Sequence, residues 1–237
     1  ADACERSWSM SDQGTERRAL VFFAAAPSTV GVVADAAPLI GAPPELIEAW
    51  QAVLPGADAV GLAVRDDLRS VRLYSQYWDT LVARLRSGVT DPAVLYAGFK
   101  SLPDGSTRVD TYVCSPSAPR AEFMPDIEQA LGPRGADPAA IEAAFAKLTP
   151  ENCIFTRTAS AGRTSWLATL RRADLSPAAL GDMLAPVLRN AEYGVEISQS
   201  VANQTTVHIA GGRDDVKGRF LTIYTEATAH DLTGFIR

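Results

Sequence analysis

Arginine and tyrosine share one face of two predicted strands, Arg72–Tyr74 and Arg108–Tyr112. Side chains alternate between the two faces of a strand, so residues two apart point the same way. In each stretch the cation and the tyrosine therefore lie on one side, and valine or leucine lies on the other. Guanidinium groups bind phosphate oxygens in pairs, and aromatic faces stabilise cations. A sheet face of this kind is suited to an anionic, partly apolar ligand.

The composition of the chain argues against several classes of protein. Of its 237 residues, 47% are hydrophobic, and the formal net charge is −6 without a long basic run. A nucleic-acid-binding protein would show a basic face. The apolar run at 19–34 is interrupted by Pro27 and is too short to cross a bilayer. We therefore expect neither a nucleic-acid partner nor a membrane partner.

Cysteine and histidine are sparse. The three cysteines lie far apart, the chain has two histidines, and no Cys/His cluster with metal-ligand spacing occurs. These features favour a reduced, cytoplasmic protein without a metal centre. No heptad repeat or conspicuous apolar patch indicates an oligomeric state, which stays open.

Turn signals between apolar runs predict a series of hairpins. The predicted pairs are residues 7–11 with 18–26, 59–65 with 70–77, 93–100 with 107–115, and 153–159 with 164–171. The last unit is predicted from strands at 194–200 and 219–225, with a further strand-like run at 205–210 and a turn at Gly211-Gly212. Helical spacing of apolar residues predicts helices at 44–54, 79–88, 125–131, 138–148 and 177–189.

The resulting order is ββα, repeated about five times, which differs from the βαβ order of a parallel sheet. Ten antiparallel strands leave open edges unless they close. We therefore predict an α+β fold in which a ten-stranded antiparallel barrel closes and is ringed by helices. No linker divides the chain, so residues 1–237 are expected to form a single domain.

This arrangement resembles the ABBA-type soluble aromatic prenyltransferases, also called PT-barrel enzymes, over about 7–225. That family builds its barrel from repeated αββα units and places Lys-x-Tyr or Arg-x-Tyr on one return strand, which Arg72–Tyr74 matches. The next return strand often carries several cations and ends in x-Tyr, which Arg108–Tyr112 matches with one change. Asp110 stands where the family often has a cation.

The resemblance implies an enzyme that moves a prenyl group from dimethylallyl or geranyl diphosphate to an aromatic small molecule inside the lumen, as part of secondary metabolism. It implies that the diphosphate is bound by Arg18, Arg72, Arg108, Arg163 and Arg219, with Lys100 and Lys217 in reserve. It implies that the allylic cation is shielded by Tyr74, Tyr96, Tyr112 and Trp166. A base must take the proton of the aromatic ring, and Asp110, Glu196 and the released diphosphate are the candidates.

The first return strand, residues 18–23, lacks the Asp that holds Mg²⁺ in metal-dependent members of the family. The resemblance therefore implies a reaction without Mg²⁺ or another cofactor. Two alternatives stay open. The barrel could bind an anionic or aromatic metabolite without chemistry, or a cyclase or isomerase could use the same lumen.

Overall fold

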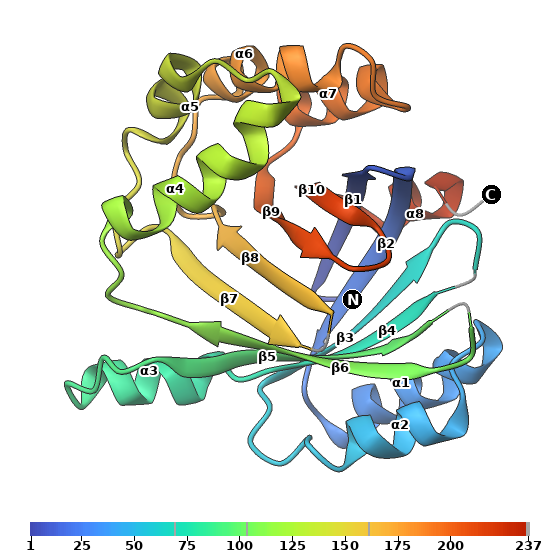
Figure 1. Ribbon diagram of the computed structural model, residues 1–237. Coiled ribbons are helices and arrows are strands. Elements are labelled where there is room, and N and C mark those ends of the chain that lie inside the picture. Colours follow the sequence, from blue (N-terminus) through green and yellow to red (C-terminus); the bar gives the residue numbers. More distant parts are fainter. Residues whose placement is uncertain (69, 103, 161, 236–237) are drawn as a thin grey trace.

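Ten antiparallel strands close into a barrel in the computed structural model, which describes residues 1–68, 70–102, 104–160 and 162–235 (Figure 1). Each strand pairs with its neighbours in the chain, and β1 pairs with β10 to close the barrel. The strands are β1 (Ala3–Ser11), β2 (Gly14–Ala24), β3 (Ala59–Arg65), β4 (Val71–Gln76), β5 (Ala93–Ser101), β6 (Thr107–Cys114), β7 (Ile154–Ser160), β8 (Arg163–Thr169), β9 (Thr206–Asp214) and β10 (Gly218–Glu226). The predicted closed barrel of the α+β class is confirmed.

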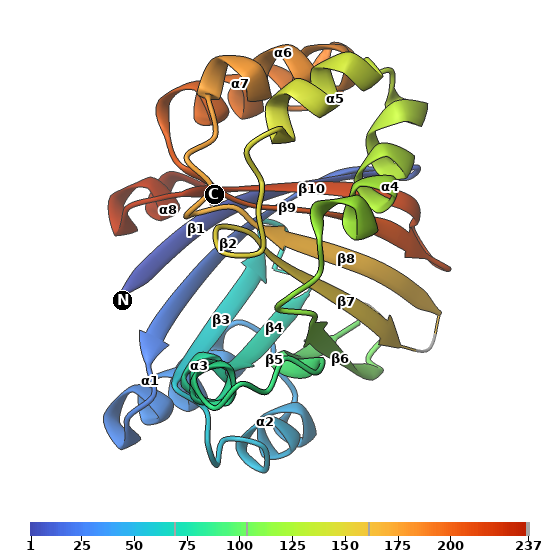
Figure 2. The same cartoon turned by 90° about the vertical axis from the view of Figure 1, so that its left-hand side faces the viewer.

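Helices connect the hairpins and lie outside the barrel (Figure 2). They are α1 (Pro27–Leu39), α2 (Pro44–Gln51), α3 (Trp78–Arg86), α4 (Arg120–Leu131), the short 3-10 turn η1 (Gly132–Arg134), α5 (Pro138–Phe145), α6 (Pro177–Leu188), α7 (Gly194–Asn203) and α8 (Ala229–Phe235). The connections are at one end of the barrel, because every hairpin turn is at the other end.

The outward faces of the strands form the hydrophobic core with these helices. Leu73 and Phe99 pack against Trp50 of α2 on one side of the barrel. On another side Phe155 stacks between Phe123 of α4 and Trp166 of β8, with ring centroids 4.9 and 5.9 Å apart. The apolar side chains on the outward faces of the strands therefore pack against the helices, and many polar side chains of the strands face the lumen.

The last unit differs from the sequence prediction. Residues 194–200, predicted as a strand, belong to helix α7, in which Ile197 and Val201 are buried one helical turn apart. The strand that pairs with β10 is β9, and Gly211-Gly212 lies inside it rather than in a turn. A Cβ atom at Gly211 would lie 2.8 Å from the Trp166 indole, so glycine is required there by a close packing contact.

Candidate active site

The strand register determines which side chains face the lumen. Arg72 of β4 lies opposite Lys100 of β5, and Lys100 lies opposite Arg108 of β6. Arg18 of β2 lies opposite Arg65 of β3. Residues that are directly opposite on neighbouring strands share a face, so these cations form a row around the inside of the barrel.

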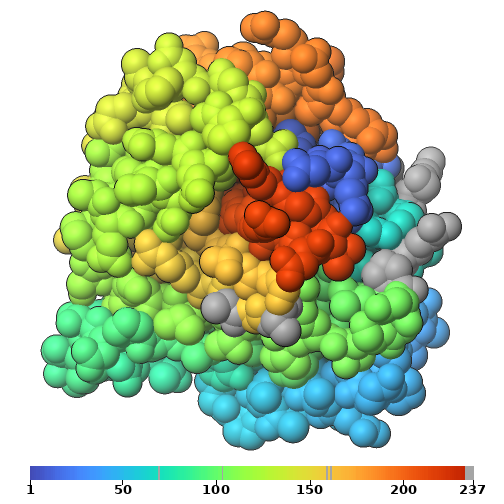
Figure 3. Space-filling model, in the orientation of Figure 1, coloured from blue at the N-terminus to red at the C-terminus, as the bar shows by residue number. Residues whose placement is uncertain are grey.

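We call the full group the cation ring. It lies at the hairpin-turn end of the lumen, and Figure 3 shows the tips of the first (blue), fourth (yellow) and last (red) hairpins together on one face. The ring consists of seven cations, Arg18, Arg65, Arg72, Lys100, Arg108, Arg163 and Lys217, with three acids among them, Glu16, Asp110 and Asp214. The excess of positive charge suits a multiply charged anion.

Asp110 is tied to the cation ring by several contacts. One carboxylate oxygen lies 3.0 Å from Nε of Arg108 and accepts a hydrogen bond of 2.8 Å from Ser160, and the other lies 3.9 Å from Arg163. Burial opposes ionisation of Asp110, but the nearby arginines 72 and 163 keep its pKa below its usual range. Asp110 is therefore an ionised group that orients the arginines.

Glu16 and Asp214 hold the other cations in place. Glu16 pairs with Arg18 at 2.5 Å and with Arg65 at 2.8 Å, and it also pairs with Lys217. Burial opposes its ionisation, but the charges of Arg18 and Lys217 hold the pKa of Glu16 well below its usual range. Asp214 accepts hydrogen bonds of 3.3 Å from the Arg108 guanidinium. Each acid thus fixes the position of an arginine beside the lumen.

Aromatic side chains line the lumen next to the cation ring. We call this set the aromatic girdle, and its members are Phe22, Tyr74, Tyr96, Tyr112 and Tyr224. The rings of Phe22 and Tyr74 are 5.9 Å apart, and those of Tyr96 and Tyr112 are 6.0 Å apart, edge to face. Such faces can stabilise a cation held between them.

Two glycines make room for the girdle. A Cβ atom at Gly98 would lie 3.0 Å from Tyr74 and 3.4 Å from Tyr112, and one at Gly61 would lie 2.5 Å from the ring of Phe22. Both glycines are on strand faces that point into the lumen, opposite the aromatic residues. The rings can therefore lie over the backbone of the neighbouring strand.

The end of the barrel away from the hairpin turns has a cavity of about 480 Å³ that we call the mouth. Glu5, Gln76, Tyr96 and His208 are among the residues that line it. Glu5 is 4% exposed, and one of its oxygens lies 3.6 Å from Nε2 of His208. Arg171 is also close to Glu5, at 3.8 Å. The mouth thus places a buried carboxylate on the opposite side of the girdle from the cation ring.

The structure brings most of the predicted site residues together in the lumen. The cation ring contains Arg18, Arg72, Arg108, Arg163 and Asp110, and the girdle contains Tyr74, Tyr96 and Tyr112. The two reserve lysines also belong to the ring. Their assignment to particular roles remains a proposal.

Three predicted site residues lie outside the lumen. Arg219 is opposite Arg213 on the outward face of β10 and lines a groove of about 1050 Å³ between α4 and the barrel. Trp166 packs into the core beneath α4, and Glu196 is on α7, 3.7 Å from Arg17. The structure does not bring Arg219 and Trp166 into the lumen because their strand positions face outward, and it does not bring Glu196 there because the segment predicted as a strand is helix α7.

Sequence reasoning missed several residues of the lumen. These are Glu16, Arg65 and Asp214 in the ring, Phe22 and Tyr224 in the girdle, and Glu5 and His208 at the mouth. The alternation of side chains along β1 could have predicted the position of Glu5. Trp8 and Met10 face outward into the core, so Glu5, an odd number of residues away from each, faces the lumen.

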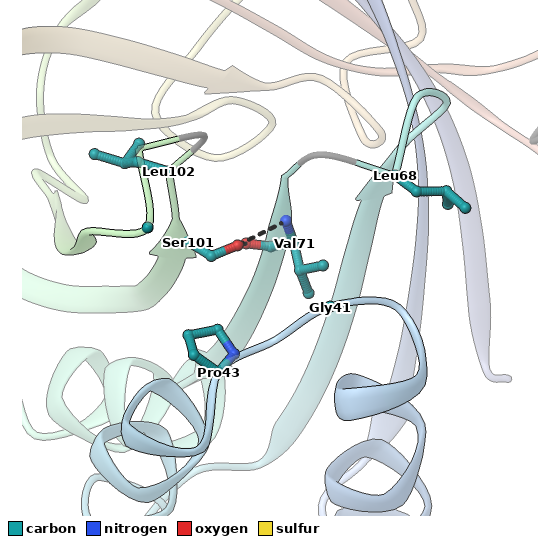
Figure 4. Close-up of a pocket in the computed structure, with 7 residues that line it drawn as sticks. Gly41, Pro43, Leu68, Val71, Ser101 and Leu102 are labelled. Carbon is teal, nitrogen blue, oxygen red and sulfur yellow. Dashed lines mark hydrogen bonds between the residues drawn. The ribbon is translucent and has the colours of Figure 1, made fainter.

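A further hollow of about 510 Å³ lies outside the barrel (Figure 4). Gly41 and Pro43 from the α1–α2 connection, Leu68, Val71 and Ser101 are among its lining residues. The Ser101 hydroxyl accepts a hydrogen bond of 3.2 Å from the Val71 amide, so it is already used by the fold. None of the described residues that line this hollow is charged, and the hollow is not part of the candidate site.

The described ranges contain neither a metal-binding cluster nor a membrane-spanning helix. No three His, Cys, Asp or Glu side chains within 1–68, 70–102, 104–160 and 162–235 are grouped so that they could hold a metal ion. In the same part of the chain, no helix has the length and apolar character needed to span a membrane.

Comparison with solved structures identifies the fold. The 5-dimethylallyltryptophan synthase of Streptomyces coelicolor aligns with a TM-score of 0.61 and 11% identity, over 94% of this chain and 80% of that one. The 6-dimethylallyltryptophan synthase of Micromonospora olivasterospora gives 0.59 and 12%, over 94% and 81%, and the prenyltransferase PriB gives 0.58 and 14%, over 94% and 79%. No protein-family model matches the chain, and no curated protein matches it in sequence. The chain therefore has the PT-barrel fold of these aromatic prenyltransferases.

Proposed function

We propose that the protein transfers a prenyl group from an allylic diphosphate to an aromatic small molecule. The observation that carries this proposal is the order of three regions along one lumen. The cation ring is followed by the aromatic girdle and then by the mouth with its buried carboxylate. Two of the solved structures with this fold support it, since one contains DMASPP and Trp, and the other contains L-tryptophan and dimethylallyl thiolodiphosphate.

The cation ring provides the first requirement of the reaction, departure of the diphosphate. When the allylic C–O bond breaks, the electron pair and the new negative charge go to the diphosphate oxygen. Arg72 on β4 and Arg108 on β6 flank this position from the two sides of β5, and Arg18 and Arg163 are on the same layer of the wall. Cations that are already oriented stabilise this charge without reorganisation, which is a large term in catalysis.

The aromatic girdle provides the second requirement, protection of the allylic cation from water. Tyr74 and Tyr112 are 9% and 8% exposed, and both are directly next to the ring in the strand register. Burial raises the pKa of Tyr112, so its phenol stays protonated and presents a neutral ring. Neutral aromatic faces stabilise the cation without forming a bond to it.

The mouth provides the third requirement, an aromatic acceptor and a base. Carbon–carbon bond formation on an aromatic ring leaves a proton that must be removed to restore aromaticity. We propose Glu5 for this role, because Asp110 is held by two arginines in the ring and Glu196 lies outside the barrel. Glu5 is buried, faces the mouth and stands across the girdle from the diphosphate site.

Metal independence also belongs to this proposal. The seven cationic side chains of the ring can neutralise the diphosphate in place of Mg²⁺. The three acids of the ring form ion pairs with arginine or lysine and are not left to bind a metal ion. We further propose that residues 1–237 form a single domain, because the pairing of β1 with β10 joins the two ends of the chain. A cytoplasmic location is consistent with Cys4, Cys114 and Cys153, which are free thiols.

A turnover assay tests the proposal. The protein is incubated with dimethylallyl or geranyl diphosphate and a panel of aromatic acceptors that includes L-tryptophan, other indoles and phenols, with and without a chelator. Diphosphate release and a prenylated product, with the same rate in the chelator, are expected. Absence of release with every pair contradicts the proposal. Tight diphosphate binding without turnover selects the non-catalytic binding protein instead.

A further inference from the structure

The cation ring contains lysine, which is rare in this chain. The sequence contains 19 arginines and three lysines, Lys100, Lys147 and Lys217, within its 22 cationic side chains. Two of the three lysines are members of the ring, whereas Lys147 is exposed on the surface. Arginine stays charged in proteins, but a lysine that loses contact with water can give up its proton. The ring therefore combines permanently charged groups with groups that can titrate.

Lys100 is the more deeply buried of the two, and it lacks an acidic partner. It is 5% exposed, and its ammonium makes no ion pair or hydrogen bond with any residue of the described ranges. Arg72 and Arg108 are directly opposite it on the two neighbouring strands. Like charges in direct cross-strand positions repel each other, and burial adds a desolvation cost.

The acids that face the ring are already occupied by other cations. Glu16 pairs with Arg18, Arg65 and Lys217, and Asp110 and Asp214 contact arginines 108 and 163. The charged groups with the largest effect on Lys100 are Arg72 on β4, Arg18 on β2, Lys217 in the β9–β10 turn and Arg108 on β6. Every one of these four groups is a cation.

We infer that Lys100 is a neutral amine in the free protein and takes up one proton from solvent when the diphosphate binds. This inference rests on the proposed function, because it assigns to the allylic diphosphate the charge that makes an ammonium at position 100 favourable. The bound anion reverses the sign of the local field. The proton goes onto Nζ of Lys100, which can then donate hydrogen bonds to the diphosphate, and it returns to solvent when the diphosphate leaves.

The direction of the pKa shifts agrees with this geometry. Burial, followed by the charges of Arg72 and the other nearby cations, lowers the pKa of Lys100 to about 5. Burial and the charge of Arg18 lower the pKa of Lys217 to about 8, although its contact with Glu16 acts in the opposite direction. At pH 7.5 most Lys217 therefore keeps its proton, and Lys100 is the residue whose charge changes.

The small number of lysines makes the inference directly measurable by NMR. Protein labelled with ¹³C at lysine Cε gives three side-chain signals, and exposed Lys147 is the internal reference. At pH 7.5 we expect the Lys100 signal at the position of a neutral amine, and at the position of an ammonium after saturation with inorganic pyrophosphate. The Lys147 signal should not move.

Calorimetry measures how many protons the protein takes up when pyrophosphate binds. The enthalpy of pyrophosphate binding is measured in buffers with different ionisation enthalpies, for the wild-type protein and for Lys100→Arg. The ligand's own protonation is common to both, so the wild type should take up about one proton more than the variant, and the variant should still bind. Equal uptake, or a Lys100 signal already at the ammonium position in the free protein, overturns the inference while the proposed function stands. Absence of pyrophosphate binding to the wild type overturns the proposed function and the coupling together.

Discussion

Arg72 is predicted to destabilise the free protein and to be required for its activity. It is 5% exposed, its Nε has no hydrogen-bond partner among the described residues, and its guanidinium donates a long hydrogen bond of 3.4 Å to the Tyr74 hydroxyl. A buried polar group without a partner costs about 1–3 kcal/mol. Burial opposes the charge of Arg72, but Tyr74, Tyr112 and Asp110 together raise its pKa above the usual value. The two phenols are neutral at pH 7, so only the attraction by Asp110 offsets part of the cost at that pH.

The substitution Arg72→Met removes the charge and keeps most of the volume. Arg72 forms no ion pair within the described residues, so an apolar group of similar size removes the cost of about 1–3 kcal/mol that a buried polar group without a partner carries. With the contribution of Asp110 subtracted, we expect the free energy of unfolding to increase by about 1–2 kcal/mol. A charge-assisted hydrogen bond contributes about 1.5–3 kcal/mol, so kcat/KM should fall about 10- to 100-fold for each bond to the diphosphate that is lost.

Urea unfolding with and without pyrophosphate measures both effects. The wild type should gain stability from pyrophosphate by mass action, and Arg72→Met should gain much less. Arg219→Met is the matched control, because Arg219 is on the outward face of β10 and its replacement should leave the pyrophosphate effect unchanged. A loss of stability greater than about 1 kcal/mol in free Arg72→Met would refute the reasoning, since it would show that the charge is well paired in the unliganded lumen.

Three further predictions concern the girdle, the mouth and the ring. Gly98→Ala places a Cβ atom 3.0 Å from Tyr74, so it should lower thermal stability and raise the KM for the acceptor; an unchanged KM would show that the girdle is not beside the acceptor. Glu5→Gln should lower kcat about 100-fold while the Kd for pyrophosphate stays the same, because Glu5 is at the opposite end of the lumen; equal loss in both would contradict its assignment. The pKa of Lys217 is lowered to about 8, so it loses its charge as the pH rises through that value. The affinity for pyrophosphate should therefore fall more steeply between about pH 7 and pH 9 in the wild type than in Lys217→Arg, whose charge is permanent. Equal pH dependence in the two proteins would place Lys217 outside the site.

Much of the barrel can be predicted from the sequence because its signals are local. The alternation in β4 and β6 gives both the strands and their inward faces, and the turns between strands give the hairpins. Closure follows from the number of antiparallel strands and the absence of another way to cover the edges. The aromatic residues at 74 and 112 and the arginines at 72 and 108 follow from the same alternation.

The errors come from long-range packing that the sequence does not show. Gly211-Gly212 reads as a turn, but these glycines are in β9, where a side chain at position 211 would collide with Trp166 and Ala130. The segment 194–200 has apolar residues compatible with a strand, but in the structure Ile197 and Val201 are buried as one face of helix α7. The resemblance implied a diphosphate contact for Arg219, but the register of β10 with β9, which only the folded barrel defines, puts this side chain on the outward face.

The balance of charge in the lumen is also a tertiary property. Glu16, Asp110 and Asp214 come from three different hairpins, and the register brings them to the same cation ring. From the sequence, Asp110 appears as a missing cation and a candidate base. In the structure Asp110 is a buried anion that contacts Arg108. We therefore propose Glu5 at the mouth, and not Asp110, as the base.

A crystal structure of the protein with dimethylallyl thiolodiphosphate and an aromatic acceptor tests the central claim most directly, because the thiolo analogue occupies the site of the reactive diphosphate. We expect the diphosphate to contact Arg72, Lys100 and Arg108 in the cation ring, and the dimethylallyl group to lie against Tyr74 and Tyr112. Occupation of the outer groove beside Arg219 instead, with an empty lumen, would contradict this claim.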